Sequence, residues 1–280
     1  MTQKYIFDKV SFKTSRLTTN EYSTSFSLGV RCLTKEFRNP IYAIYGFVRF
    51  ADEIVDSFHD YDKRSLLQRF KEDTWLAVDE KVSLNPILNS FQATVHEFQI
   101  EREIIEQFLI SMEMDLERRE YDHPDFERYI LGSAEVVGLM CLRVFCNGHE
   151  EQYQTLKPAA MKLGSAFQKV NFLRDLHADF TVLGRCYFPG LTIESFDEES
   201  KSKIEASISS DFHAAFSGIK RLPRGARLGV YVAYLFYSTL FKKIQNMPPT
   251  HILQNRVSVP NRHKLVILGY SFVKHQLNLI

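Results

Sequence analysis

Two segments of the chain carry pairs of aspartates on an otherwise apolar background. In residues 40–58, Asp52 and Asp56 are four positions apart, and Tyr45 and Arg49 precede them. At about 100° per residue, these four side chains lie within about 60° of one another on a helix. Apolar residues cover most of the remaining surface, so the two like charges would be buried. Burial of this kind is costly unless something positive lies over the stripe.

A second polar stripe occurs in residues 150–180. Gln168, Asn171, Asp175 and Asp179 are spaced by three, four and four residues and share one helix face. Roughly one Asp-x-x-x-Asp pair is expected by chance in a chain of this length, and Asp60 is interpreted as a helix cap. Two pairs, each inside an apolar helix and each extended by polar residues, favour a functional site over a solvated face.

Facing carboxylate pairs are hard oxygen ligands of the kind that Mg²⁺ prefers, and Mg²⁺ usually keeps waters and binds phosphate oxygens as well. The two stripes therefore predict a site in which bridging Mg²⁺ ions hold a diphosphate, with Arg49 completing the neutralisation of charge. The chain contains 23 Phe and 13 Tyr, which indicates a large apolar interior. Such an interior beside a diphosphate site would suit a prenyl chain.

The elements that must position these stripes are predicted to be helices. Only 12 Gly and 9 Pro are present, too few for the turns of a β-sandwich or barrel of this length. Asn39-Pro40 and Asn85-Pro86 each place a capping residue before a proline suited to a first helical turn. One long irregular segment, 183–197, is expected to be functional. We expect one all-α domain over residues 1–280, with helices near 18–34, 40–58, 62–80, 86–98, 101–120, 125–147, 150–180, 198–221, 224–246 and 261–279.

Composition excludes several other classes of protein. Apolar residues make up 45% and charged residues 25%, and the net charge of +1 argues against a nucleic-acid partner. The four cysteines form neither a CxxC motif nor a disulfide framework, so we expect reduced thiols and a cytoplasmic location. No signal-peptide core is expected at the N-terminus. The longest uncharged stretch, 228–241, is shorter than the about 20 residues of a spanning helix and is interpreted as a core helix.

Other candidate motifs carry less weight. Glu120-x-x-His123 has the form found in di-iron carboxylate bundles, but only one copy is present, so we interpret it as a loop. Cys186 has no neighbouring base and is interpreted as a packing residue. A basic group near the C-terminus is interpreted as a solvated face, with peripheral contact with an anionic membrane as the alternative; its members are Arg256, Arg262, His263 and Lys264.

At the level of motifs, the chain resembles the squalene and phytoene synthase family, and most closely its bacterial phytoene synthases. The resemblance covers nearly the whole sequence. It lies in the segments STSF (23–26), YAIYGFVRFADEIVD (42–56), YILGSAEVVGLM (129–140), FQKVNFLRD (167–175) with Asp179, and GRCYFP (184–189). The resemblance implies an all-α isoprenoid-synthase helical bundle around a central cavity.

The resemblance also implies roles for individual residues. Asp52 and Asp56 match the first aspartate-rich motif and Asp175 and Asp179 the second, and both motifs would bind Mg²⁺, or alternatively Mn²⁺, bridged to substrate diphosphates. Tyr45 and Tyr129 match cavity tyrosines near the reacting carbons. The positions that match diphosphate or metal contacts are Ser23, Ser25, Arg49, Gln168 and Asn171, with Arg174 and Arg185 as further diphosphate ligands. One departure is Glu135, which stands where many members have a small residue in a cavity-lining helix.

By this resemblance, the expected activity is phytoene synthesis in the carotenoid pathway. Two geranylgeranyl diphosphates would condense head to head through a cyclopropylcarbinyl diphosphate, with loss of both diphosphates and no need for a nicotinamide. Two alternatives remain open. One is a squalene or dehydrosqualene synthase that uses farnesyl diphosphate, and the other is a catalytically silent relative that acts as an assembly factor. Val30, one turn beyond Phe26, leaves room for the longer substrate if that face lines the cavity.

Overall fold

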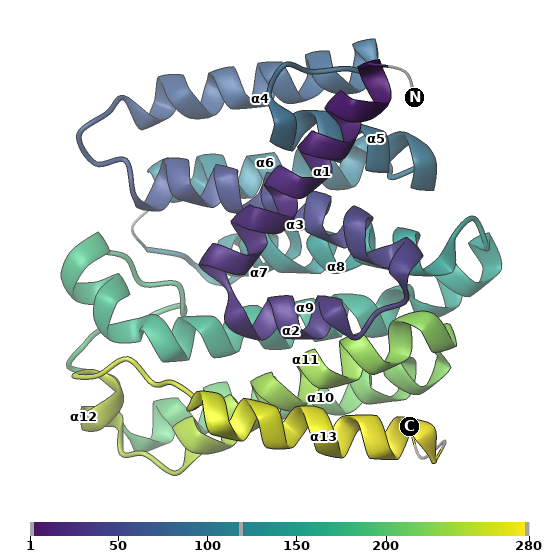
Figure 1. Ribbon diagram of the computed structural model, residues 1–280. Helices are drawn as coiled ribbons and strands as arrows, with labels where there is room; N and C mark the ends of the chain where they lie inside the picture. The colour runs from purple at the N-terminus through teal and green to yellow at the C-terminus, as the bar shows by residue number, and fades with distance from the viewer. Residues whose placement is uncertain (1–2, 118–119, 278–279) are drawn as a thin grey trace.

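The structure of the protein is a computed structural model that describes residues 3–117, 120–277 and 280. Helices form successive layers, with α4 at one end of the molecule and α13 at the other (Figure 1). The described residues contain no β-strand, and a single β-bridge joins Glu120 to Cys186. The helices are α1 (Gln3–Tyr22), α2 (Thr24–Arg31), α3 (Lys35–Asp56), α4 (Lys63–Glu80), α5 (Pro86–Phe98), α6 (Arg102–Glu117), α7 (His123–Ile130), α8 (Val136–Cys146), α9 (Glu150–Ala178), α10 (Glu198–Arg221), α11 (Arg224–Gln245), α12 (Pro249–Ile252) and α13 (Asn261–Gln276).

Five of these helices form a closed ring. Helix α2 packs on α3, α3 on α8, α8 on α9, α9 on α11, and α11 returns to α2. Both aspartate pairs belong to this ring, because α3 carries the first pair and α9 leads into the second. Several aromatic or apolar side chains of the ring are only partly buried, among them Phe26, Val48, Val137, Phe167 and Tyr237.

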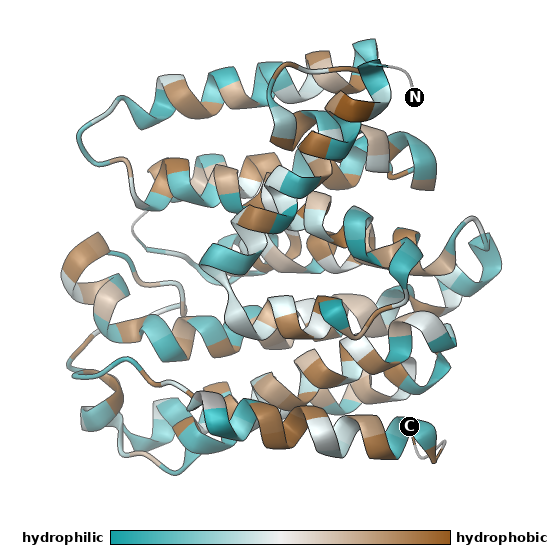
Figure 2. Cartoon of the chain, in the orientation of Figure 1, coloured by the Kyte–Doolittle hydropathy of each residue, from teal (hydrophilic) through white to brown (hydrophobic). Residues whose placement is uncertain are grey.

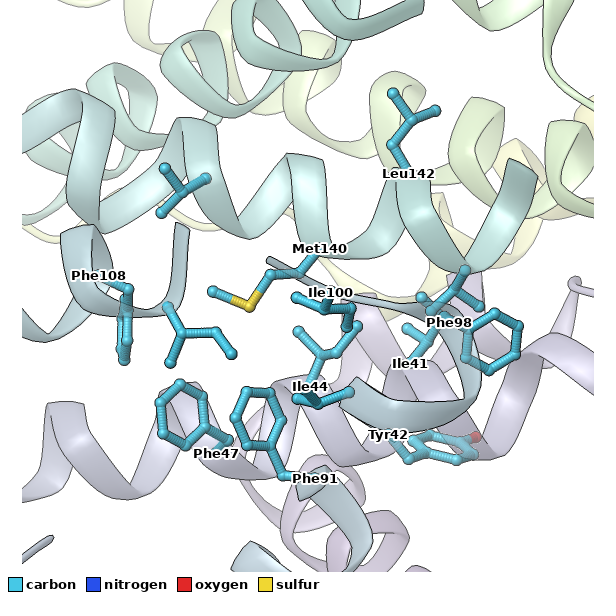
Figure 3. Packing of buried hydrophobic residues seen from close by; sticks show 14 of the residues in the cluster. Ile41, Tyr42, Ile44, Phe47, Phe91, Phe98, Ile100, Phe108, Met140 and Leu142 are labelled. Carbon is cyan, nitrogen blue, oxygen red and sulfur yellow. The ribbon is translucent and has the colours of Figure 1, made fainter. Parts of the chain in front are cut away.

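The core consists mainly of two apolar clusters. The larger is built around α3, where Phe47 stacks on Phe91 with ring centroids 3.9 Å apart and also contacts Phe108 (Figure 3). The second gathers residues of α7, α9, α10 and α11 with the irregular segment that follows α9. The ring therefore has a packed core on each side, which fixes the orientation of α3 and α9.

Two π-helical turns interrupt the ring helices. Residues Leu131–Glu135 form the turn η1 between α7 and α8, and Asp179–Leu183 form η2 at the end of α9. Helix α9 crosses η1 at close range, since a Cβ atom on Gly164 of α9 would lie 2.5 Å from the carbonyl oxygen of Ala134 in η1. Such turns are frequent at functional sites, and here one of them begins at the last aspartate of the second pair.

The structure corrects the predicted N-terminal helix. Residues 18–34 contain the end of α1 and the whole of α2, because the helix is interrupted at Ser23. The Ser23 side chain caps α2 by accepting a hydrogen bond from the Phe26 N–H (3.2 Å). Helix α1 begins at Gln3, far before the predicted start. The helix after it begins at Lys35 with Thr34 as its N-cap, so the prediction that Asn39-Pro40 starts a helix is wrong. Pro40 is buried instead in the second turn, where packing offsets its missing N–H.

The remaining boundaries agree more closely. Asn85 caps α5 with Pro86 at its start, as predicted, and Asp122 caps α7. The short helix α12 was not predicted. The predicted helices 101–120 and 261–279 include residues 118–119 and 278–279, which lie outside the described residues. One continuous helix, His123–Cys146, is long and apolar enough to cross a membrane, but 56% of its most apolar window is buried, as in the core helix of a soluble protein.

Candidate active site

The first polar stripe is present on α3. Tyr45, Arg49, Asp52 and Asp56 keep part of their surface accessible, whereas Phe47 and Ala51 between them are fully buried. Protein surrounds Asp52 closely enough that burial raises its pKa to about 8, and the neighbouring Asp56 carboxylate acts in the same direction. Negative charge at this position therefore lacks full compensation from the protein.

Arg49 is placed differently from the prediction. Its guanidinium forms an ion pair with Glu53 and lies 4.3 Å from the centre of the Tyr22 ring. Arg49 still lowers the pKa of Asp52 through its charge, although burial outweighs this effect. Its Nε atom is buried without a hydrogen-bond partner, so one donor in the site is free to bind a ligand.

The second polar stripe continues from α9 into η2. Burial alone would raise the pKa of Asp175, but Arg174 and Arg256 outweigh it and lower the pKa. Arg174 Nε lies 3.0 Å from Asp175 Oδ1, and Arg256 Nε lies 2.7 Å from the same oxygen. Among the described residues Asp179 has no such partner, and burial together with Asp175 and Asp56 raises its pKa to about 7 despite the opposing charge of Arg185. The second motif therefore contains one compensated and one uncompensated carboxylate.

Arg185 connects the two aspartate motifs. Its Nη1 atom donates a hydrogen bond to Asp56 Oδ1 (3.0 Å), and its backbone N–H donates to the carbonyl oxygen of Asp179 (2.8 Å). The guanidinium is buried, and its Nη2 atom reaches the carbonyl oxygen of Val55 at 3.3 Å. Residues that are far apart in the sequence, on α3 and after α9, are thus held together at one end of the ring.

Asp115 is a member of this network that the sequence did not reveal. This carboxylate on α6 lies 3.6 Å from Arg185 Nη1. It accepts hydrogen bonds from three tyrosine hydroxyls, those of Tyr129 (2.7 Å), Tyr187 (3.0 Å) and Tyr121 (3.2 Å). Burial raises its pKa to about 6 despite the opposing charge of Arg185. Its position could have been noticed, because it continues the apolar stripe of Ile105, Phe108 and Met112 at helical spacing.

Tyr129, a predicted cavity residue, is therefore held by a hydrogen bond and by aromatic contacts. Its ring lies 5.0 Å from that of Tyr187 and 5.9 Å from that of Phe172. Only 3% of its surface is accessible. The hydroxyl donates to Asp115, which fixes the orientation of the ring.

The other predicted tyrosine, Tyr45, lies at the junction of four ring helices. Its ring stacks on Phe26 of α2 at 4.7 Å, and burial raises its pKa to about 12. A second stacked pair joins two other helices of the ring, with Tyr237 of α11 on Phe167 of α9 at 4.0 Å. The charge of Tyr237 acts in the direction that raises the pKa of Tyr45.

The predicted polar ligands lie around these aromatic pairs. Asn171 accepts a hydrogen bond from the Tyr237 hydroxyl (3.2 Å) and donates one to Gln168 Oε1 (3.3 Å). Ser23 caps α2 and lowers the pKa of Tyr45 against the larger effect of burial, while Ser25 is half-buried on the first turn of the same helix. Glu135 does not belong to this group, because the charges that act on it are those of Lys162, Asp211 and Lys169 on α9 and α10, together with Glu127.

The residues of the two motifs fit a divalent cation. No three His, Cys, Asp or Glu side chains within the described ranges are grouped closely enough to hold a metal ion on their own. Mg²⁺ needs no such cage, since it is usually held by one or two carboxylates, waters and substrate phosphates. Asp52 and Asp179 supply carboxylate oxygens whose charge the protein leaves uncompensated. A cation between the two motifs would remove this repulsion.

The chain has the all-α fold seen in squalene and dehydrosqualene synthases. Its structure matches that of a dehydrosqualene synthase with a TM-score of 0.82 at 20% identity, covering 96% of this chain and 98% of the other. A squalene synthase from Alicyclobacillus acidocaldarius gives a TM-score of 0.74 at 19% identity, with coverage of 86% and 95%.

Sequence comparison assigns the family. The model of the squalene/phytoene synthase family matches residues 19–263, and the chain belongs to this family. A presqualene diphosphate synthase from Rhodopseudomonas palustris is 30% identical over 59% of this chain and 58% of its own length. Phytoene synthase 1 of Solanum lycopersicum is 27% identical over 91% of this chain, and the match spans 66% of that protein. The phytoene synthase of Cereibacter sphaeroides is 26% identical, with coverage of 91% and 78%.

Proposed function

We propose that the protein is a prenyltransferase that condenses two geranylgeranyl diphosphates head to head to form phytoene, with release of two diphosphates. The observation that carries this proposal is the junction of the two aspartate motifs through Arg185. That junction brings carboxylates of α3 and α9 together with Arg174, Arg185 and Arg256 at one end of a ring lined by aromatic residues. Acidic and basic groups at one place suit a ligand that combines metal cations with diphosphate anions.

The residues of the site would act on the departing diphosphate and on the cation left behind. Mg²⁺ bound by Asp52, Asp56, Asn171, Asp175 and Asp179 would neutralise the charge that develops on the leaving diphosphate. Arg49, Arg174 and Arg185 would add hydrogen bonds to its oxygens, with Gln168 and the hydroxyls of Ser23 and Ser25 as further contacts. The allylic C–O bond breaks, diphosphate departs with the electron pair, and an allylic cation remains. The faces of Tyr45 and Tyr237 would stabilise this cation.

The following steps need orientation and exclusion of water. The double bond of the second substrate attacks the cation, and loss of a proton closes a cyclopropane ring that still carries one diphosphate. Loss of this diphosphate, rearrangement and a second proton loss give the hydrocarbon. The released diphosphate is a suitable base for both protons, since it stays beside the carbons that lose them. Tyr129, held by Asp115, would form part of the wall around the rearranging cation.

A farnesyl-based, thirty-carbon product is the second candidate. It is favoured by the 30% identity to a presqualene diphosphate synthase and by the fold match to a dehydrosqualene synthase. Phytoene is favoured by the phytoene synthases that match nine tenths of this chain. No nicotinamide would be needed for phytoene, whereas squalene requires NADPH for its final reduction. For the location of the enzyme we propose the cytoplasm, which suits four free cysteines.

The experiment that tests the proposal is a substrate comparison. Purified protein is incubated with Mg²⁺ and either labelled geranylgeranyl or labelled farnesyl diphosphate, with and without NADPH, and the extracted products are identified by mass. Phytoene formed from geranylgeranyl diphosphate, at equal yield with and without NADPH, is expected. Squalene or dehydrosqualene as the main product would replace the forty-carbon assignment by the second candidate. No turnover of either substrate would leave the silent assembly factor.

A further inference from the structure

Charge is distributed unevenly along the chain. All 34 Asp and Glu residues lie at or before Asp211, and residues 212–280 contain ten Lys and Arg residues and no acidic residue. The first 211 residues, with 25 basic side chains, therefore carry a formal charge of −9, and the last 69 carry +10. The overall value of +1 hides this asymmetry. The basic part comprises the end of α10, helices α11 to α13, and the segments between them.

Most of this positive charge is not neutralised inside the protein. Among the described residues, Arg256 is the one member of the ten that forms an ion pair with an Asp or Glu side chain. Others bind backbone oxygens, as Lys243 does with Ser258 (2.8 Å), or lie over aromatic rings, as Lys274 does with Tyr270. Lys220, Arg221, Lys242 and Arg262 are exposed. The last 69 residues therefore contribute a field that attracts anions.

Helix α13 at the same end has its apolar side turned outward. Its most accessible apolar residues include Val266 (69% exposed) and Val273 (55%). Its buried side contains Ser271, whose hydroxyl bonds the Ile267 carbonyl. Figure 2 shows the hydrophobic colour along this helix at the edge of the molecule. The exposed apolar set is Leu265, Val266, Tyr270, Phe272, Val273 and Leu277.

These six side chains share one face. At 100° per residue they span an arc about 160° wide, and Arg262 falls within the same arc one turn before Val266. Helix α13 packs mainly on α11, and the exposed arc is the part of its surface that does not contact α11. An apolar face next to unpaired cations is the pattern of a helix that lies in the plane of a membrane surface.

We propose that α13 and the basic end around it dock the protein on an anionic lipid bilayer. The apolar arc would enter the boundary between headgroups and acyl chains, and the flanking cations would bind lipid phosphates. The absence of acidic residues from the last 69 positions is what favours a lipid surface over a second copy of this chain. Two copies meeting through α13 would bring two positively charged ends together.

The docked end is connected to the active site. The segment that leads into α13 contains Arg256, which bonds Asp175 at 2.7 Å. His177, two residues further along α9, bonds the carbonyl oxygen of Leu253 at 2.6 Å. The segment before α13 therefore links the proposed membrane-binding helix to the second aspartate motif.

Vesicle sedimentation tests the proposal. The full chain is mixed with vesicles of phosphatidylcholine alone or of phosphatidylcholine with phosphatidylglycerol, at low and high salt. The test variant is Val266→Glu with Val273→Glu, which adds two charges to the apolar arc without touching the core. The matched control is Leu76→Glu with Leu84→Glu, at positions 55% and 92% exposed around α4, at the opposite end of the molecule (Figure 1). Circular dichroism checks the fold of both variants.

We expect the wild-type protein and the control to bind the anionic vesicles, with weaker binding at high salt and to neutral vesicles. The α13 variant should bind at least about tenfold more weakly, because each charge near the surface changes binding by about fivefold. Equal binding of the α13 variant, or no binding by the wild-type protein, would overturn the proposal. A wild-type dimer that the α13 variant converts to a monomer, without vesicle binding, would identify the face as a contact between copies and would also overturn it.

Discussion

Replacement of Arg185 by Met tests the buried charge network that joins the two aspartate motifs. Burial raises the pKa of Asp115 from 3.8 to about 6, although Arg185 opposes the change. The folded state therefore binds this proton more tightly than the unfolded chain does. Its stability falls as the pH rises from about 4 to about 6, by roughly 3 kcal/mol, and this contribution is constant at higher pH.

Loss of the guanidinium raises the pKa of Asp115 further, so the carboxyl stays protonated to higher pH. Protonation limits the free-energy cost of burying this carboxyl. The additional, pH-dependent destabilisation of Arg185→Met relative to the wild-type protein can reach about 2 kcal/mol at pH 7.5 and falls towards zero near pH 6. Asp56, whose side chain is 44% accessible and also loses its partner, adds less because solvent screens its charge. With an unfolding entropy of about 2.1 cal/mol/K for each of 280 residues, the Tm should fall by a further 3 °C or so between pH 6 and pH 7.5.

Calorimetric or chemical unfolding at both pH values measures this difference. The matched control is Arg143→Met, since Arg143 also pairs with two carboxylates but these belong to the surface residues Glu101 and Glu150. The pKa of Glu150 is lowered by its hydrogen bond with Arg143, so this group titrates well below the tested range. The control should lose the same stability at both pH values. A deficit of Arg185→Met that does not grow with pH would refute the proposed coupling between Arg185 and Asp115.

Three further predictions concern the site and the packing behind it. Alanine at any one of the four aspartates of the two motifs should lower product formation by orders of magnitude and leave the circular dichroism spectrum unchanged. These aspartates are Asp52, Asp56, Asp175 and Asp179. Near-normal turnover of a variant would show that the replaced residue does not belong to the site. Val30→Phe should shift the ratio of kcat/KM values toward farnesyl diphosphate, and an unchanged ratio would show that Val30, buried in the core, does not set chain length. Gly164→Ala should destabilise the protein by about 1–3 kcal/mol in urea unfolding because its Cβ would overlap the Ala134 carbonyl. Gly269→Ala on the open side of α13 should instead stabilise the protein by about 0.5–1 kcal/mol. Equal changes in the free energy of unfolding for the two variants would contradict the close crossing of α9 and η1.

Most helices were predictable because their buried faces are apolar, and α1 shows why most of one long helix was missed. Its buried side chains are hydroxyl-bearing, namely Ser11, Ser15, Thr18 and Thr19, while Ile6 and Leu17 are exposed. The hydroxyls are satisfied locally or across the contact, as in the bond between Ser15 and Ser90 (2.7 Å). Small polar residues let α1 approach α3, where a Cβ on Gly46 would meet Ser15 Oγ at 3.0 Å. Hydrophobic periodicity cannot detect a helix that packs in this way.

The site was predictable to the extent that it is local in sequence. Asp52 and Asp56 share a helix face by spacing alone, and the same holds for Asn171 and Asp175. The link between the motifs is not local, because Arg185 and Asp56 are 129 residues apart. The contacts of Arg49 with Tyr22 and of Asp175 with Arg256 were also not predictable, since they depend on how α1 and the segment before α13 pack against the ring.

The central claim is that this site joins two prenyl diphosphates, and the stoichiometry of diphosphate release tests it most directly. Free diphosphate and extracted hydrocarbon are measured together during turnover of geranylgeranyl diphosphate with Mg²⁺. Head-to-head condensation predicts one diphosphate released for each substrate consumed, and one forty-carbon hydrocarbon for every two substrates. A twenty-carbon alcohol in place of the hydrocarbon, with the same release of diphosphate, would show hydrolysis without condensation and would contradict the claim.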